Sequence, residues 1–91
     1  MDSVLEKIRD YADKAHGTQQ RKYSPERYIV HPVRVMEMCR RHTESLPVLA
    51  AALLHDVLED TPVTQRELHQ FLLTVMNGEE AKKTTQLVVE L

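Results

Sequence analysis

The uninterrupted apolar run over residues 48–54 constrains the fold more than any other stretch of the sequence. A helix that is apolar on every side has no face to offer to solvent, so it belongs inside a protein core. Alanine and leucine favour helix over strand, and Pro47 suits the first helical position. Thr61 precedes Pro62 and is therefore biased away from helical geometry. We expect one buried helix that ends near Asp60.

This helix would carry one histidine and three carboxylates at its C-terminal end. At i, i+4 spacing, His55 would lie over Glu59 and Asp56 over Asp60. Acidic side chains at the negative end of a helix dipole cost about 0.3–1 kcal/mol each. A bound cation would offset that cost. The alternative is a solvated helix end with a cluster of surface acids, which is common.

Composition places the chain among soluble globular proteins of all-α class. With 91 residues it is one domain or part of one. Its net charge of −2 argues against a non-specific nucleic-acid binder. The charge is uneven, because residues 1–45 carry nine Lys/Arg and seven Asp/Glu, whereas residues 46–91 carry three and seven. A basic half facing an acidic half could hold an anionic substrate over a metal.

Cysteine and hydropathy patterns bear on location. Cys39 is the only cysteine, so there is no disulfide framework, and a cytoplasmic location is expected. Neither a signal peptide nor a run of about 18 apolar residues is present, so no membrane-spanning segment is expected. The sequence gives no indication of oligomeric state.

Capping signals mark the other helices. Ser3–Glu6 and Thr64–Glu67 both have the pattern of a capping box. Gly17 suits the left-handed position that ends a helix. His69 is expected on the exposed side of its helix. Together with the buried helix, the pattern predicts a bundle of about five helices, the other four over residues 3–15, 31–41, 64–76 and 79–91.

The last residues, Val88-Val89-Glu90-Leu91, contain no glycine, asparagine or cationic side chain to finish a helix. We therefore expect residues 1–91 to be the N-terminal portion of a single longer domain. The alternative is a complete small domain with a frayed final helix.

Two further positions have alternative interpretations. Arg21 and Lys22 lie in a polar segment and are either a solvated basic pair or a phosphate clamp, since arginine suits phosphate oxygens. His31 stands at the start of the second long helix. It is either a structural hydrogen-bonding residue or a ligand.

Taken in chain order, these motifs resemble the HD-domain superfamily. They resemble more closely the hydrolase domain of the RelA/SpoT-homologue proteins and their stand-alone small alarmone hydrolases. The resemblance covers roughly residues 10–64. A His-Asp pair alone is a weak motif, but the ordered set is specific: Arg21-Lys22, His31-Pro32, His55-Asp56 and Glu59-Asp60-Thr61.

The resemblance implies an all-α HD-domain bundle with Mn²⁺-dependent phosphohydrolase activity. The implied substrate is guanosine tetra- or pentaphosphate, hydrolysed at the 3′-pyrophosphate by a water that the metal activates. Imidazole and carboxylate ligands with open positions suit an octahedral ion such as Mn²⁺. Position by position, the implied roles are metal binding for His31, His55 and Asp56, orientation and activation of water for Glu59 and Asp60, and nucleotide binding for Arg21 and Lys22.

One departure from the family pattern bears on the metal site. The family has a further metal-binding aspartate on a later helix, and no matching motif follows Thr61 here. The only later acids are Glu67, Glu79, Glu80 and Glu90. The metal site within these residues is therefore expected to be incomplete.

Two alternatives to the alarmone hydrolase remain open. One is an HD-domain phosphohydrolase of another nucleotide. The other is a domain that binds a nucleotide or a protein and does no chemistry. The absence of a fourth ligand favours the second alternative. The complete His-Asp-x-x-Glu-Asp set over residues 55–60 argues against it.

Overall fold

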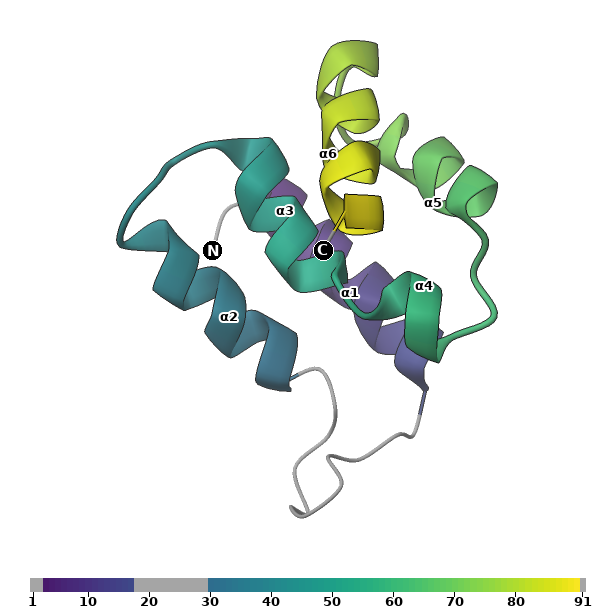
Figure 1. The fold of residues 1–91 in the computed structure, drawn as a ribbon, viewed down its shortest axis with the longest axis horizontal. Coiled ribbons are helices and arrows are strands. Elements are labelled where there is room, and N and C mark those ends of the chain that lie inside the picture. Colours follow the sequence, from purple (N-terminus) through teal and green to yellow (C-terminus); the bar gives the residue numbers. More distant parts are fainter. Residues whose placement is uncertain (1–2, 18–29, 91) are drawn as a thin grey trace.

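The computed structural model describes residues 3–17 and 30–90, and every regular element in these ranges is a helix. The all-α prediction is confirmed. No helix in the two ranges is both long and apolar enough to cross a lipid bilayer. Arg21 and Lys22 lie outside the described residues. In chain order the elements are α1 (Ser3–His16), α2 (Val30–Arg40), α3 (Leu46–Leu54), α4 (Val57–Asp60), α5 (Gln65–Leu72) and α6 (Gly78–Glu90) (Figure 1).

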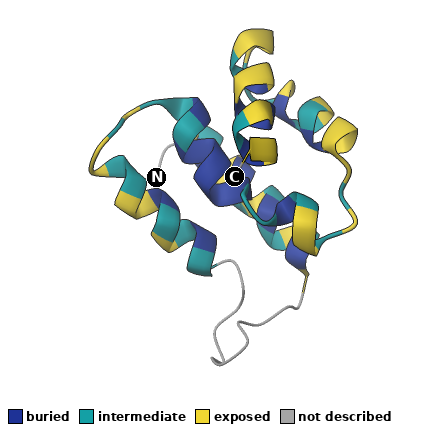
Figure 2. Ribbon diagram, viewed as in Figure 1, coloured by how far each residue is buried: buried dark blue, intermediate teal, exposed yellow. Residues whose placement is uncertain are grey.

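Helix α3 is the centre of the fold and packs against α1, α2 and α6. Every side chain from residue 49 to residue 54 is buried, with no more than 4% of any residue exposed. Figure 2 shows the later part of this helix in dark blue, with α2 on one side and α6 on the other. Burying one leucine side chain stabilises the fold by about 1.5–3 kcal/mol, so α3 contributes a large share of the core. The prediction of a buried helix is confirmed.

The predicted continuation of this helix to Asp60 is wrong. Helix α3 ends at Leu54, and α4 is a separate single turn. Between them, Asp56 has φ −99° and ψ −2°, in the bridge region between helix and strand. The His55 imidazole bonds the carbonyl of Ala52, which would accept the Asp56 N–H in a continuous helix. A short polar residue such as aspartate also favours local turns over helix interiors.

The predicted signals at two helix ends are confirmed. Gly17 has φ 63° and closes α1. Thr64 and Glu67 form the capping box of α5, with the Thr64 hydroxyl oxygen accepting the Glu67 N–H at 3.1 Å. Helix α5 ends at Leu72, earlier than the predicted residue 76, and the chain then turns toward α6.

Helix α6 buries two polar residues, Thr84 and Thr85, against the rest of the bundle. Their hydroxyls donate to backbone carbonyls one turn earlier in α6, at 2.7 and 2.8 Å, which satisfies them inside the core. His69 on α5 lies 3.3 Å from the Thr85 hydroxyl, measured from Nδ1 to Oγ1. The prediction that His69 is exposed is wrong, because this contact leaves it half-buried.

Candidate metal centre

The hairpin formed by α2 and α3 brings together residues that are far apart in the sequence. The two helices are joined by a short connection and pack against each other, so the start of α2 lies beside the end of α3 (Figure 1). His31 is in the first turn of α2. His55 directly follows α3, and Asp56 precedes α4. All three side chains therefore reach the same end of the hairpin.

These three side chains form a compact group of donor atoms. One ligand atom from each of His31, His55 and Asp56 lies within 4.8 Å of the other two. His55 Nε2 is 3.0 Å from Asp56 Oδ2. The rings of His31 and His55 meet edge to face, with centroids 5.4 Å apart and an interplanar angle of 68°. The structure thus brings the three predicted metal ligands together.

A backbone contact fixes the orientation of His55. Its Nδ1 lies 2.6 Å from the carbonyl oxygen of Ala52. A carbonyl can only accept, so Nδ1 carries the proton, and Nε2 faces Asp56. Metal-binding histidines commonly use one ring nitrogen in this way, because the bond fixes both tautomer and ring direction. The carbonyls of the last helical turn lack intrahelical donors, so Ala52 is free to accept this bond.

The surroundings of the group favour a cation. The side chains of His55 and Asp56 are each only 20% exposed, so their charges are partly shielded from water. The group also stands at the C-terminal end of α3, where the helix dipole is negative. Two imidazole nitrogens and one carboxylate oxygen form a donor set that suits divalent transition metals. The residues present therefore fit a divalent ion with open coordination positions.

The other predicted acids lie outside this group. Glu59 and Asp60 are exposed on α4 and are not among the three clustered donors. They were predicted one helical turn after His55 and Asp56 on a continuous helix, whereas in the structure they belong to the separate turn α4. The turn still ties α4 to the group, because the Asp60 N–H donates to the Asp56 carbonyl at 2.9 Å. Within residues 30–90, no carboxylate after Thr61 joins the cluster.

An apolar cavity borders the donor group. Its volume is about 240 Å³, and it lies among α2, α3 and α6. His55 is the one group member that lines it, beside apolar side chains and Cys39. The His55 imidazole therefore has apolar side chains on this side.

Sequence reasoning missed the Ala52 carbonyl as the group that orients His55. A histidine placed three residues after a carbonyl in the last turn of a helix can reach back to it, so the spacing carried a usable signal. That signal required the helix to end at Leu54, and the apolar and helical pattern gave no such boundary.

Comparison with known proteins gives the family. A family model described as "HD domain" matches residues 9–77, which include all three clustered donors. No solved structure matches the chain significantly.

Curated relatives carry related names. The chain is 34% identical over 88 residues to a "Probable guanosine-3′,5′-bis(diphosphate) 3′-pyrophosphohydrolase" of Mycoplasma pneumoniae, covering 97% of this chain and 11% of that protein. It is 41% identical over 66 residues to the Spiroplasma citri protein named guanosine-3′,5′-bis(diphosphate) 3′-pyrophosphohydrolase, covering 72% and 9%. It is 46% identical over 59 residues to the "Bifunctional (p)ppGpp synthase/hydrolase SpoT" of Escherichia coli K12, covering 65% and 8%. The chain thus spans about a tenth of the length of these relatives.

Proposed function

This chain belongs to the HD-domain family, and from that premise we propose that it serves in a divalent-metal-dependent phosphohydrolase acting on guanosine 3′,5′-bis(diphosphate). Water would cleave the bond between ribose O3′ and the diphosphate, releasing pyrophosphate and guanosine 5′-diphosphate. The names of the relatives support this choice of substrate class. We propose further that residues 1–91 are the N-terminal portion of the hydrolase domain and act in the cytoplasm.

The cluster of His31, His55 and Asp56 is the single observation that carries the proposal. These residues would hold the metal. Mn²⁺ is the ion we propose, since the family resemblance implies it and a mixed imidazole and carboxylate donor set is compatible with it. A divalent ion held there supplies Lewis-acid activation of water and neutralises charge on the diphosphate. The bond from His55 to Ala52 keeps the imidazole aligned before any ligand arrives, which lowers the cost of ordering the site.

Glu59 and Asp60 would orient and activate the attacking water. Both are exposed on α4, where they remain accessible to solvent and substrate. Of the two, Glu59 would accept the proton, and Asp60, one turn from Asp56, would orient the water. Loss of either carboxylate would lower turnover while leaving the three clustered donors in place.

Arg21 and Lys22 would bind the phosphates of the nucleotide. Both lie outside the described residues, so the proposal rests on their charge and on their place in the family motif. Phosphoryl transfer depends mainly on positioning and electrostatic stabilisation, and two adjacent cations supply both. An arginine can engage two phosphate oxygens at once, whereas a lysine acts as a point charge.

A non-catalytic binding domain is the second candidate function. One observation favours it: the described residues cluster three donors, and neither Glu59 nor Asp60 is among them. Such a domain would bind a nucleotide or a protein without turnover.

Replacing Glu59 separates the two candidates. We would measure release of pyrophosphate from guanosine 3′,5′-bis(diphosphate) with Mn²⁺ present, for the unaltered chain, Glu59→Ala and the control Glu37→Ala, which removes an exposed acid from α2. A catalytic role predicts a fall of at least about 100-fold for Glu59→Ala, with Mn²⁺ binding retained and Glu37→Ala unaffected. Absence of turnover in all three proteins, with metal binding intact, would support the binding domain. A panel of other nucleotides tests the substrate.

A further inference from the structure

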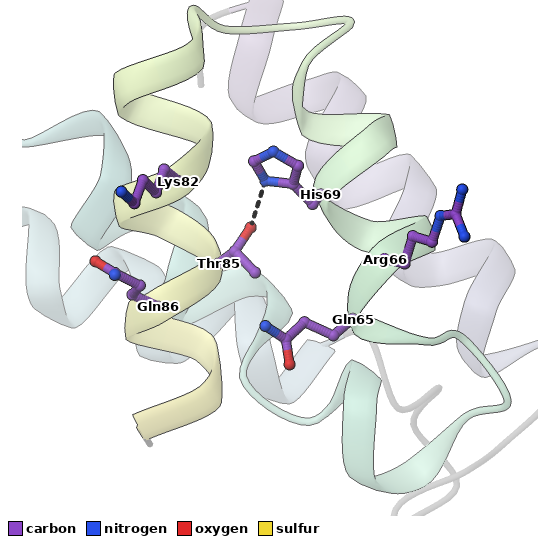
Figure 3. A pocket seen from close by; sticks show the side chains of 6 residues that line it. All are labelled: Gln65, Arg66, His69, Lys82, Thr85 and Gln86. Carbon is purple, nitrogen blue, oxygen red and sulfur yellow. Dashed lines mark hydrogen bonds between the residues drawn. The ribbon is translucent and has the colours of Figure 1, made fainter.

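A second cavity lies between α5 and α6, with a volume of about 520 Å³. It shares no lining residue with the metal centre. All six of its lining residues carry polar side chains, and none is a carboxylate (Figure 3). They are Gln65, Arg66 and His69 from α5, and Lys82, Thr85 and Gln86 from α6.

The cavity has positively charged side chains in its lining, whereas the second half of the chain is acidic overall. Residues 46–91 contain seven carboxylates and only three Lys/Arg side chains. Two of those three cations, Arg66 and Lys82, line the cavity, and none of the seven carboxylates does. Because cations and no carboxylates line the cavity, it favours an anionic ligand, although this half of the chain is acidic overall.

A fixed hydrogen-bond relay forms the floor. Thr85, only 5% exposed, donates its hydroxyl proton to the Ala81 carbonyl at 2.8 Å. Its oxygen therefore accepts from His69 Nδ1 at 3.3 Å, which leaves the lone pair of His69 Nε2 to accept from a hydroxyl group of a ligand. Figure 3 shows His69 and Gln65 directed from α5 toward Thr85 on α6. The floor is thus preorganised.

Arg66 and Lys82 place positive charge at the rim. In Figure 3 the head groups of Lys82 and Arg66 extend away from the middle of the groove, on opposite sides. Both side chains are long enough to fold inward over a ligand, at a cost of up to about 2 kcal/mol each in lost rotamer freedom. Arginine and lysine pair strongly with phosphate oxygens, and the glutamine amides can bond hydroxyl groups.

We propose that this groove binds the phosphate group of a small polar metabolite, such as a polyol phosphate. Its volume falls within the range of small-molecule sites, about 300–1,000 Å³. None of the six lining residues is a phenylalanine, tyrosine or tryptophan, so the groove lacks the large aromatic faces typical of nucleobase sites. Because the groove shares no lining residue with the metal centre, the two proposals are independent.

Titration of the isotope-labelled chain with glycerol 3-phosphate, followed by NMR, tests the proposal. EDTA would keep the metal centre free of ions, and ionic strength would be held constant because salt screens exposed charges. We expect shift changes centred on residues 65–69 and 82–86, with a dissociation constant in roughly the millimolar range. Inorganic phosphate should bind more weakly, because it lacks the polyol hydroxyl groups that the glutamine amides would bond.

A pair of adjacent lysines provides the matched control. Lys82→Gln should weaken binding about tenfold, as expected for the loss of one charge-assisted hydrogen bond. Lys83→Gln removes the same charge from an exposed residue that does not line the groove, so binding should change less than about twofold. Equal losses in both variants, shifts centred on His31 and His55, or no saturable shifts would overturn the proposal. Equally tight binding of inorganic phosphate would overturn the assignment to a phosphorylated metabolite.

Discussion

Truncation of Leu53 to alanine tests whether α3 is the centre of the fold. Leu53 has no exposed surface and lies within the buried stretch of α3. Leu→Ala substitutions at such sites lower the free energy of unfolding by about 2–5 kcal/mol, since they lose burial and leave a cavity. Domains of this size have a total of only about 5–15 kcal/mol. Each kcal/mol corresponds to about 4–8 °C in Tm, so a fall of at least about 8 °C is expected.

Urea unfolding followed by circular dichroism at the helical signal measures this change. Leu73→Ala is the matched control, because Leu73 is 48% exposed and loses the same atoms. Substitutions on the surface usually change stability by less than about 0.5 kcal/mol. Equal destabilisation by the two substitutions would refute the central position of α3.

Three further substitutions test individual contacts. Thr64→Ala should lower the free energy of unfolding by about 1 kcal/mol, measured by urea unfolding, since it removes the acceptor for the Glu67 N–H. Thr64→Ser keeps a hydroxyl acceptor and should retain the stability of the unaltered chain. Gly17→Ala should cost about 1 kcal/mol by the same assay because φ is 63°, whereas Gly78→Ala, at a glycine without positive φ, should not. Burial, and secondarily the charge of Glu67, raise the pKa of Tyr11 from its usual value, so an ultraviolet titration should show a late-titrating component that Tyr11→Phe removes.

The raised pKa of Tyr11 also fixes the direction of a pH effect. The folded state favours the neutral phenol, so this contribution to stability is complete below the unfolded pKa near 10. It is lost as the pH rises through the higher folded pKa. Tyr11→Phe should therefore be less sensitive than the unaltered chain to unfolding above pH 10, and equal sensitivity would contradict the assignment.

Local chemistry explains which elements could be predicted. The apolar run in α3 is stable only inside a protein core, and the structure buries this helix. The capping box at Thr64 and the left-handed Gly17 depend on neighbouring residues alone, so the sequence was sufficient for both.

The break after Leu54 could not be predicted, because it depends on a side chain competing for a backbone carbonyl. His55 bonds Ala52, and Asp56 takes a bridge conformation. Neither choice is visible in hydrophobic periodicity. The burial of His69 was missed for a related reason, since Thr85 is polar and its place on the inner face depends on a hydrogen bond to its own helix.

The candidate site was predictable in composition but not in arrangement. The family resemblance implied His31, His55 and Asp56 as ligands, and the hairpin of α2 and α3 brings them together. Helical spacing placed Glu59 under His55 and Asp60 under Asp56. The Asp60 N–H still bonds the Asp56 carbonyl, but neither Glu59 nor Asp60 joins the donor cluster. Their roles in turnover, like those of Arg21 and Lys22, are proposals for mutagenesis.

Calorimetric titration with Mn²⁺ tests the central claim most directly. The three donors come from both sides of the α2–α3 hairpin, so removing one should abolish the site. We predict one-to-one binding to the 91-residue chain, lost in His31→Ala and retained in His42→Ala, whose histidine is exposed and outside the donor cluster. Absence of binding to the unaltered chain, or equal binding by His31→Ala, would contradict the metal centre.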